Sequence, residues 1–266
     1  MSIVVSLTTS PKRLPLIGAT LDSIINQSVK PSKIYVNIPP IFKRTNEKYP
    51  DPKTIFGDKY NDIVIWNNNC EDLGPITKLQ GTLNIIDQDD DTWIITIDDD
   101  ILYLKYNIEL YASCLDKIKN YKNNAYGLSG FIWHANAIQA QYENGATHIL
   151  EGFGSVCYHR SFFPNKSWNS YLNICLSDNY CKFSDDIIIS NWLALTKINR
   201  VVVSTPWVNR RMMWANSCIL EYGNMKDALH NGGELNLEGN NNATRYNKVK
   251  QFLCKHKLLS KDCCII

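Results

Sequence analysis

The sequence has no long apolar run and almost no net charge. Its 28 lysines and arginines and 26 aspartates and glutamates give a formal charge of +2, so it lacks the strongly basic surface expected of a nucleic-acid-binding protein. No segment approaches the ~20 apolar residues that cross a bilayer, and the apolar stretch near residue 1 is too short for a signal-peptide core. These absences predict a cytosolic protein that recognises its ligands locally and does not bind nucleic acid.

The sequence also lacks any C-x-x-C pair, although it contains nine cysteines. An odd number without paired spacing fits neither a zinc ribbon nor the disulfide framework of a secreted domain. We therefore expect reduced thiols, most of them packed as small hydrophobic side chains. At 266 residues and 44% hydrophobic composition, the chain can bury a substantial core in one large domain or two fused halves.

Strand and helix patterns alternate along the first part of the chain. Short apolar runs typical of buried strands cover residues 2–7, 33–39, 62–66 and 92–97. Apolar residues three and four apart predict helices over residues 14–25, 74–86 and 107–118. This alternation predicts an open α/β sheet with mostly parallel strands, in which ligands bind beyond the carboxyl ends of the strands.

The second part of the chain is less regular. Strand patterns cover residues 125–135, 154–159 and 199–205, and helical patterns cover residues 184–196 and a basic C-terminal segment. We expect Ser184 to cap the first of these helices.

Three consecutive aspartates, Asp98, Asp99 and Asp100, follow the fourth strand pattern in "WIITIDDDILYL". In an extended segment residues two apart face the same way, so the pattern predicts that Asp98 and Asp100 share a site while Asp99 points elsewhere. Two such carboxylates repel unless a cation lies between them, and Mg²⁺ or Mn²⁺ takes oxygen ligands while leaving positions for phosphates. Acidic runs are also common in solvated turns. The run at residues 87–91 reads as one, because it precedes the strand.

Five segments in order resemble the GT-A glycosyltransferases, in particular small virus-encoded and bacterial members. They are "VVSLTTSPKRLPLIGATLDSIINQSVKPSKIYVNIP", "EDLGPITKL", "TIDDDIL", "LEGFGSVCYHRSFF" and "FSDDIIISNWLA", spanning residues 3 to about 195. The resemblance implies an α/β GT-A fold in one domain, residues 1–266. Residues 1–105 would form a Rossmann-like nucleotide-binding half, residues 106–240 a smaller acceptor-binding half, and residues 241–266 a basic C-terminal helix and tail.

The resemblance further implies a hexosyltransferase that moves a sugar from a nucleoside-diphosphate sugar, with UDP favoured, to a hydroxyl of a glycan or glycoprotein. The cofactor would be Mn²⁺ or Mg²⁺, with Asp100 as direct ligand, Asp98 near the ribose or a metal-bound water, and His230 as a third ligand. A lone histidine is equally well explained as structural. The implied nucleotide-binding residues are Thr8, Thr9, Ser10, Arg13, Asp72, Lys78, Asp98 and Asp99.

Residues of the second half would bind donor sugar and acceptor: Glu151, Gly152, Phe153, Asp185, Arg210 and Arg211. An acceptor hydroxyl needs a positioned carboxylate to take its proton, and the resemblance implies Asp186 as that base in an inverting reaction. Acidic residues also occur in first helical turns because they complement the helix dipole, so capping is the alternative for Asp185 and Asp186. A solvated surface position is the alternative for Lys78, and a β-bulge for Gly152.

Other readings compete with a glycosyltransferase. A haloacid-dehalogenase-like phosphatase also ends a strand with D-x-D, and a non-catalytic protein that binds sugar nucleotides or carbohydrate would need no base. The C-terminal "CCII", beginning at Cys263, fits a prenylation pattern except for its last residue. It predicts peripheral membrane association as an alternative to a free chain in the cytoplasm, which is the host cytoplasm if the protein is viral.

Overall fold

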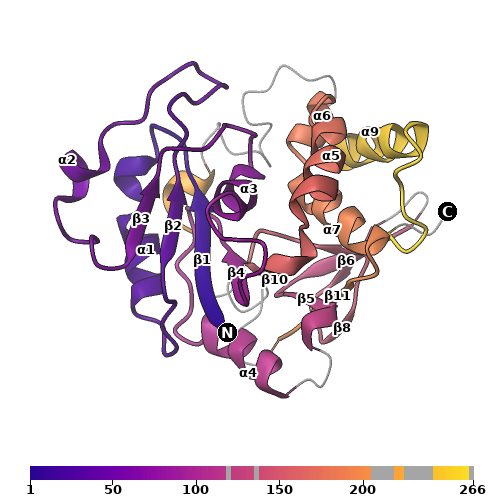
Figure 1. Cartoon of the computed structure of the whole chain (residues 1–266), viewed down its shortest axis with the longest axis horizontal. Coiled ribbons are helices and arrows are strands. Elements are labelled where there is room, and N and C mark those ends of the chain that lie inside the picture. The colour runs from indigo at the N-terminus through magenta and orange to yellow at the C-terminus, as the bar shows by residue number, and fades with distance from the viewer. Residues whose placement is uncertain (118–120, 135–137, 205–218, 225–241, 264–266) are drawn as a thin grey trace.

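The computed structural model describes residues 1–117, 121–134, 138–204, 219–224 and 242–263. These residues form two sheets with helices around them (Figure 1). The larger sheet has eight strands in the order β3-β2-β1-β4-β10-β5-β11-β8, and a smaller sheet has the order β7-β6-β9.

Residues 1–117, the predicted first half together with the helix that follows it, supply four strands and four α-helices. Their elements are β1 (Ser2–Thr8), a 3₁₀ turn (Leu14–Leu16), α1 (Gly18–Ile25), β2 (Ile34–Asn37), α2 (Pro52–Phe56), β3 (Val64–Asn67), α3 (Thr77–Leu83), β4 (Thr92–Thr96) and α4 (Asn107–Lys117). Strand β1 pairs in parallel with both β2 and β4, and β2 pairs in parallel with β3. Every residue of β2 and β4 is buried, as expected for strands covered on both faces.

The second half extends the same sheet and adds the smaller one. Its strands are β5 (Asn124–Gly127), β6 (Gly130–Trp133), β7 (Ile138–Gln141), β8 (Gly145–Ala146), β9 (Ile149–Leu150), β10 (Val156–His159) and β11 (Asn199–Val202). Its helices are α5 (Asn165–Cys175), α6 (Asn179–Lys182), α7 (Asp185–Leu195) and α9 (Asn242–Lys255), with 3₁₀ turns at Tyr121–Asn123, Arg160–Phe162 and Glu221–Asn224. Helices α5, α6, α7 and α9 gather on the right in Figure 1.

Strand β10 joins the halves, because it pairs antiparallel with β4 on one side and β5 on the other. One sheet therefore runs from the first half into the second, and the prediction of an α/β fold with an open, mostly parallel sheet is confirmed. The single strand expected at residues 125–135 is wrong in detail. It is two strands in different sheets, β5 and β6, which are separated at Leu128 and Ser129.

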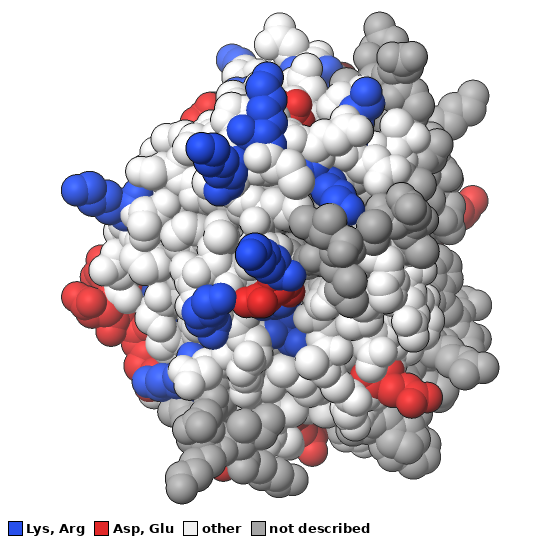
Figure 2. All heavy atoms as spheres, turned by 90° about the vertical axis from the view of Figure 1, so that its right-hand side faces the viewer, with Lys and Arg blue, Asp and Glu red and all other residues white. Residues whose placement is uncertain are grey.

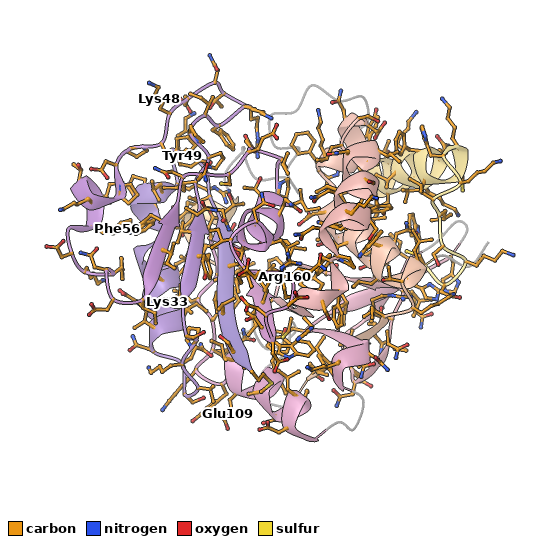
Figure 3. All side chains as sticks on the ribbon, in the orientation of Figure 1. Lys33, Lys48, Tyr49, Phe56, Glu109 and Arg160 are labelled. Carbon is orange, nitrogen blue, oxygen red and sulfur yellow. The ribbon has the colours of Figure 1, made fainter. Side chains whose placement is uncertain are left out.

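A buried arginine, Arg160, fixes the junction of the halves and lies near the centre of Figure 3. Its guanidinium donates to the carbonyl oxygens of Ile86, Phe163 and Leu83 at 2.9, 2.8 and 3.2 Å, and to Asn165 Oδ1 at 2.6 Å. A buried charge is tolerated where all its donors find acceptors. Arg160 thus ties the end of α3 to the loop before α5.

The C-terminal tail packs against the second half. Asn191 of α7 donates to the Leu258 carbonyl at 2.9 Å and accepts from the Ser260 amide at 2.8 Å, and Arg200 donates to the Asp262 carbonyl at 2.5 Å. Cys263, predicted as a lipidation site, has a fully buried side chain, which does not favour that prediction. No described helix has the length and apolar character that spanning a membrane requires.

On the face shown in Figure 2, described lysine and arginine side chains lie at several places, and some of them surround an acidic side chain near the centre of the view.

Candidate active site

A cavity of about 490 Å³ opens at the carboxyl ends of β1 and β4 and extends to the start of α7. It is lined by most of the site residues that the sequence predicts. They are Thr8, Thr9, Ser10, Arg13, Asp72, Lys78, Asp98, Asp99, Asp100, Glu151, Phe153, Asp185 and Asp186. Gly152 lies against it. His230, Arg210 and Arg211 fall outside the described residues.

The three aspartates follow β4 and converge on the loop after β1. The Arg13 guanidinium donates to Asp99 Oδ1 at 3.1 Å and to Asp100 Oδ2 at 3.2 Å. Thr9 Oγ1 donates to Asp99 Oδ2 at 2.5 Å, and the Tyr222 hydroxyl donates to the Asp99 carbonyl at 2.6 Å. The aspartate loop is therefore held by the β1 loop and by a segment more than 120 residues downstream.

The prediction that Asp99 points away from Asp100 is wrong. Strand β4 ends at Thr96, so the two-residue alternation of a strand no longer applies where the aspartates begin. The carboxylates of Asp99 and Asp100 instead share the Arg13 guanidinium, and all three aspartates line the cavity.

Lys78 of α3 connects the aspartate loop to the start of α7. Its ammonium lies 2.9 Å from Asp98 Oδ1 and 3.2 Å from Asp185 Oδ2, and the residue is only 7% exposed. Burial by itself would lower the pKa of Lys78, but Asp185, Asp98 and Asp186 raise it well above its usual value. The alternative of a solvated helix lysine is therefore wrong. Lys78 is a buried cation between two carboxylates.

Asp186 is oriented by the backbone of the neighbouring loop. The Gly152 amide donates to Asp186 Oδ1 at 2.8 Å. A Cβ at position 152 would lie 2.9 Å from that oxygen and 3.0 Å from Lys78 Nζ, so any larger residue would displace one of these two side chains. Burial, followed by the nearby charge of Asp185, raises the pKa of Asp186 well above its usual value. A partly buried carboxylate with a raised pKa is what a general base requires.

The helix that carries Asp186 is not capped as expected. Ser184 occupies the N-cap position of α7 but makes no side-chain cap bond, and its buried hydroxyl oxygen has no hydrogen-bond partner among the described residues. Its backbone (φ −132°, ψ 51°) departs from the extended conformation typical of capping residues. Ser184 lines the cavity beside Asp185.

Aromatic and basic residues of the loop before α2 line another part of the cavity, and the sequence did not reveal them. Phe42, Arg44 and Tyr49 belong to this wall. The Arg44 guanidinium lies 5.1 Å from the Phe42 ring centre, and the Tyr49 hydroxyl donates to the Thr9 carbonyl at 2.7 Å (Tyr49 is labelled in Figure 3). The sign available in the sequence was the presence of two aromatic residues in an otherwise polar loop, which could have indicated a ligand-binding wall.

Asp72 shapes this part of the cavity by holding two turns. Its carboxylate accepts from the amides of Lys43 at 2.7 Å and Gly74 at 2.9 Å. Gly74 has φ +76°, and a Cβ there would meet the Lys182 carbonyl at 2.9 Å, so this turn requires glycine. Asp72 thus fixes the loop that packs against the segment leading into α7.

The C-terminal helix also reaches the cavity, through Arg245 and Tyr246 of α9. The Tyr246 ring stacks on Phe131 of β6, with centroids 5.6 Å apart and an interplanar angle of 17°. A basic amphipathic helix near the end of a sequence gives no local sign of an active-site role, so the sequence predicts none for α9.

Gly223 is another residue near the site that the sequence did not predict. A Cβ at this position would lie 2.7 Å from Asp100 Oδ2.

The aspartate loop fits a divalent cation that substrate helps to hold. The described residues contain no cluster of three or more potential histidine, cysteine or carboxylate ligands, but Mg²⁺ and its relatives are commonly bound by one or two carboxylates together with phosphate oxygens. Burial, together with Asp99 and Asp98, raises the pKa of Asp100 to about 7 in spite of Arg13. The loop thus carries more negative charge than its arginine compensates, and Asp98 and Asp100 offer hard oxygen ligands.

No protein-family model matches the sequence, and no curated protein matches it. Among solved structures, Staphylococcus aureus TarS residues 1–349 is similar with a TM-score of 0.47 and 13% identity, over 98% of this chain and 73% of that one. The 2-C-methyl-D-erythritol 4-phosphate cytidylyltransferase of Francisella tularensis is similar with a TM-score of 0.42 and 17% identity, over 82% of this chain and 98% of that one. A CMP:2-keto-3-deoxy-manno-octonic acid synthetase structure with CTP has a TM-score of 0.43 and 11% identity, over 81% and 95%.

Proposed function

We propose that the protein is a metal-assisted glycosyltransferase. It moves a sugar from a nucleoside-diphosphate sugar, with UDP favoured, to a hydroxyl of a glycan or glycoprotein. The observation that carries the proposal is one cavity that joins an aspartate loop at the ligand edge of the sheet to a separately oriented carboxylate, Asp186. Donor and acceptor chemistry need these two features at opposite ends of one site.

The nucleotide would lie at the end formed by the β1 loop and the loop before α2. Hydroxyl groups of Thr8, Thr9 and Ser10 line this end and can bond ribose or phosphate oxygens. Phe42 and Tyr49 offer aromatic faces for a base, and Arg44 offers a guanidinium that suits a phosphate. Asp98 and Asp100 would hold Mn²⁺ or Mg²⁺, which stabilises the charge developing on the departing diphosphate. His230 remains a proposed third ligand, and Arg210 and Arg211 a proposed cover over the diphosphate.

Asp186 would take the proton of the acceptor hydroxyl as that oxygen attacks the anomeric carbon. The Gly152 amide holds the Asp186 carboxylate on one oxygen, which leaves its second oxygen for the hydroxyl. Attack from the side opposite the diphosphate makes the reaction a single displacement with inversion. Lys78 limits repulsion between Asp98 and Asp185 while both lie near reacting groups.

The test is release of nucleoside diphosphate from a panel of nucleotide sugars, with and without Mn²⁺. We expect Mn²⁺-dependent release from at least one donor, at a slow rate with water as acceptor. The product's anomeric configuration should be opposite to that of the donor. Asp100→Ala should abolish the Mn²⁺-dependent release of nucleoside diphosphate. Asp58→Asn, which alters an exposed carboxylate that does not line the cavity, should release as much as the wild type.

Two results would overturn the proposal. If no donor is turned over while p-nitrophenyl phosphate is hydrolysed, the phosphatase reading is correct. If donors bind without turnover under every condition, the protein is a sugar-nucleotide-binding protein. No described feature favours the phosphatase, because the aspartates follow β4, whereas the phosphatase nucleophile usually follows the first strand.

A further inference from the structure

The part of the cavity around Asp186 is acidic and partly aromatic. We use "acceptor end" for the part lined by Glu151, Phe153, Ser184, Asp186 and Tyr246. These residues come from the loop after β9, the start of α7 and the C-terminal helix α9. The acceptor end is therefore built by three segments spread over nearly 100 residues.

Carboxylates outnumber cations around the acceptor end. Glu151, Asp185 and Asp186 line the cavity there. The cations lining this part are Arg245 and Lys78, and Lys78 is shared with Asp98 of the donor loop. Asp185 and Glu151 both raise the pKa of Asp186, and the opposing attraction of Lys78 does not cancel their effect together with burial. A further carboxylate or phosphate on an acceptor would add to this repulsion, since like charges in a partly dry site interact strongly.

Aromatic side chains form the remaining walls. Phe153, Phe183 and Tyr246 line the cavity, and the stacking of Tyr246 on the buried ring of Phe131 fixes its plane. A rigid aromatic face binds the apolar C–H face of a sugar ring and loses little conformational entropy in doing so. A peptide segment or an extended lipid chain would gain little from such isolated faces interleaved with carboxylates.

One polar group in this wall lacks a partner. Ser184 is 3% exposed, and its hydroxyl oxygen makes no hydrogen bond within the described structure. Buried hydroxyls are nearly always paired, and this one also gives up the cap bond that its position usually provides. A hydroxyl-bearing ligand beside Asp186 would supply the missing partner.

We propose that the acceptor is a neutral saccharide that stacks on Tyr246 of the C-terminal helix, and that the carboxylates around Asp186 reject acidic sugars. The inference rests on the proposed glycosyltransferase function and specifies its acceptor. It also gives α9 a role in specificity, with Tyr246 as a binding residue and Glu151 as the residue that discriminates by charge.

The experiment compares acceptors that differ only in charge. Release of nucleoside diphosphate is measured with Mn²⁺ and the most active donor. The acceptor is either methyl β-glucoside or methyl β-glucuronide, which differ only at C6, where the glucuronide is charged. The corresponding neutral and acidic galactose derivatives form a second pair. We expect kcat/KM to be about tenfold or more higher for the neutral member. Glu151→Gln should at least halve this ratio by accelerating the uronate, because it removes one repelling charge.

Variants of α9 test the stacking face. Tyr246→Leu should raise KM for the neutral glycoside about tenfold, within the range that aromatic pairs contribute, while Tyr246→Phe and Tyr246→Trp keep KM within about threefold because they keep a ring. Lys248→Ala, at an exposed position of the same helix, is the matched control and should change neither KM nor the charge ratio. Circular dichroism melts verify that each variant is folded.

The contrary outcomes separate this inference from the proposed function. Equal or faster transfer to the uronates would overturn the charge argument and assign Arg245 to an acidic acceptor. Donor turnover that no neutral glycoside accelerates would also refute the inference while leaving the glycosyltransferase intact. Absence of turnover with every nucleotide sugar would overturn both. A Tyr246→Leu enzyme with unchanged KM would exclude the stacking role.

Discussion

The raised pKa of Asp100 in the aspartate loop leads to a prediction about how the stability of the protein depends on pH. Asp100 has a pKa of about 7 in the folded protein against an ordinary value of 3.8, because of burial and the neighbouring Asp99 and Asp98. The folded state therefore binds this proton more tightly than the unfolded state does. Stability is greatest while Asp100 is protonated in both states and falls as pH rises from about 4 through 7. Asp100→Asn, which mimics the protonated form, should remove this loss.

The size of the effect follows from the two pKa values. At about 1.4 kcal/mol for each tenfold change in proton affinity, holding Asp100 ionised in the folded metal-free protein costs about 4 kcal/mol. The side chain is only 16% exposed, so screening by solvent reduces this little. At roughly 2–4 °C per kcal/mol for a chain of this size, even half of that energy would raise the melting temperature of Asp100→Asn by about 4 °C or more at pH 8. At pH 4 the two proteins should melt within about 1 °C of each other.

The assay is a series of thermal melts from pH 4 to pH 8 in the presence of EDTA, repeated with Mn²⁺. Without metal, Asp100→Asn should gain on the wild type as pH rises. With Mn²⁺ at neutral pH, the wild type should be stabilised and the variant should not, because only ligands of the native state raise its melting temperature. Asp58→Asn serves as the exposed-carboxylate control. Destabilisation of Asp100→Asn by the same amount at every pH would refute the reasoning, and equal stabilisation of both proteins by Mn²⁺ would refute the metal assignment.

The other predictions concern the base and its surroundings. Asp186→Asn should lower kcat about 10²–10⁴-fold, as measured by nucleoside diphosphate release at saturating substrates, with donor affinity nearly unchanged. In the wild type, kcat should fall on the acidic side at a pH well above 4, because the pKa of Asp186 is raised and only the ionised carboxylate is a base. Gly152→Ala should lower kcat in a folded protein, since the new Cβ would crowd the Asp186 carboxylate and the Lys78 ammonium; a melt and a turnover assay check this, and full activity would contradict it. Lys78→Met should lower the free energy of unfolding by about 3 kcal/mol in urea titrations, the lower end for breaking a buried ion pair, because it leaves the buried Asp185 and the half-buried Asp98 without a cation between them. A loss below about 1 kcal/mol would contradict a stabilising role for Lys78.

Local patterns predicted the sheet well because buried strands and helices repeat at short, fixed spacings. Helix α5 was missed although its signal was present: its buried residues Trp168, Tyr171, Leu172 and Cys175 lie three, four and seven apart, as expected for one face of a helix. The pattern was hidden by polar residues around it. The two strands β5 and β6 were merged because a change of sheet leaves no mark in an apolar run.

The site was predictable where its residues follow a strand or begin a helix, as at Asp100 and Asp186. It was not predictable where long-range packing decides. Nothing local to Tyr246 shows that α9 lies beside Asp186, which precedes it by 60 positions in the chain. Likewise, alternation failed for Asp99 because a strand's periodicity stops where its hydrogen bonds stop, and that point depends on the neighbouring strands.

Lys78 explains why the two halves form one site. Its ammonium donates a hydrogen bond to Asp98, which follows β4 in the first half, and forms an ion pair with Asp185, which begins α7 in the second. These two ion pairs tie the aspartate loop after β4 to the start of α7. The Gly152 amide donates to Asp186, and a Cβ at position 152 would lie 3.0 Å from Lys78 Nζ, so the three groups are close neighbours. In the proposed glycosyl transfer, the proposed metal ligand Asp98 and the proposed base Asp186 would therefore be linked through Lys78 and its immediate surroundings.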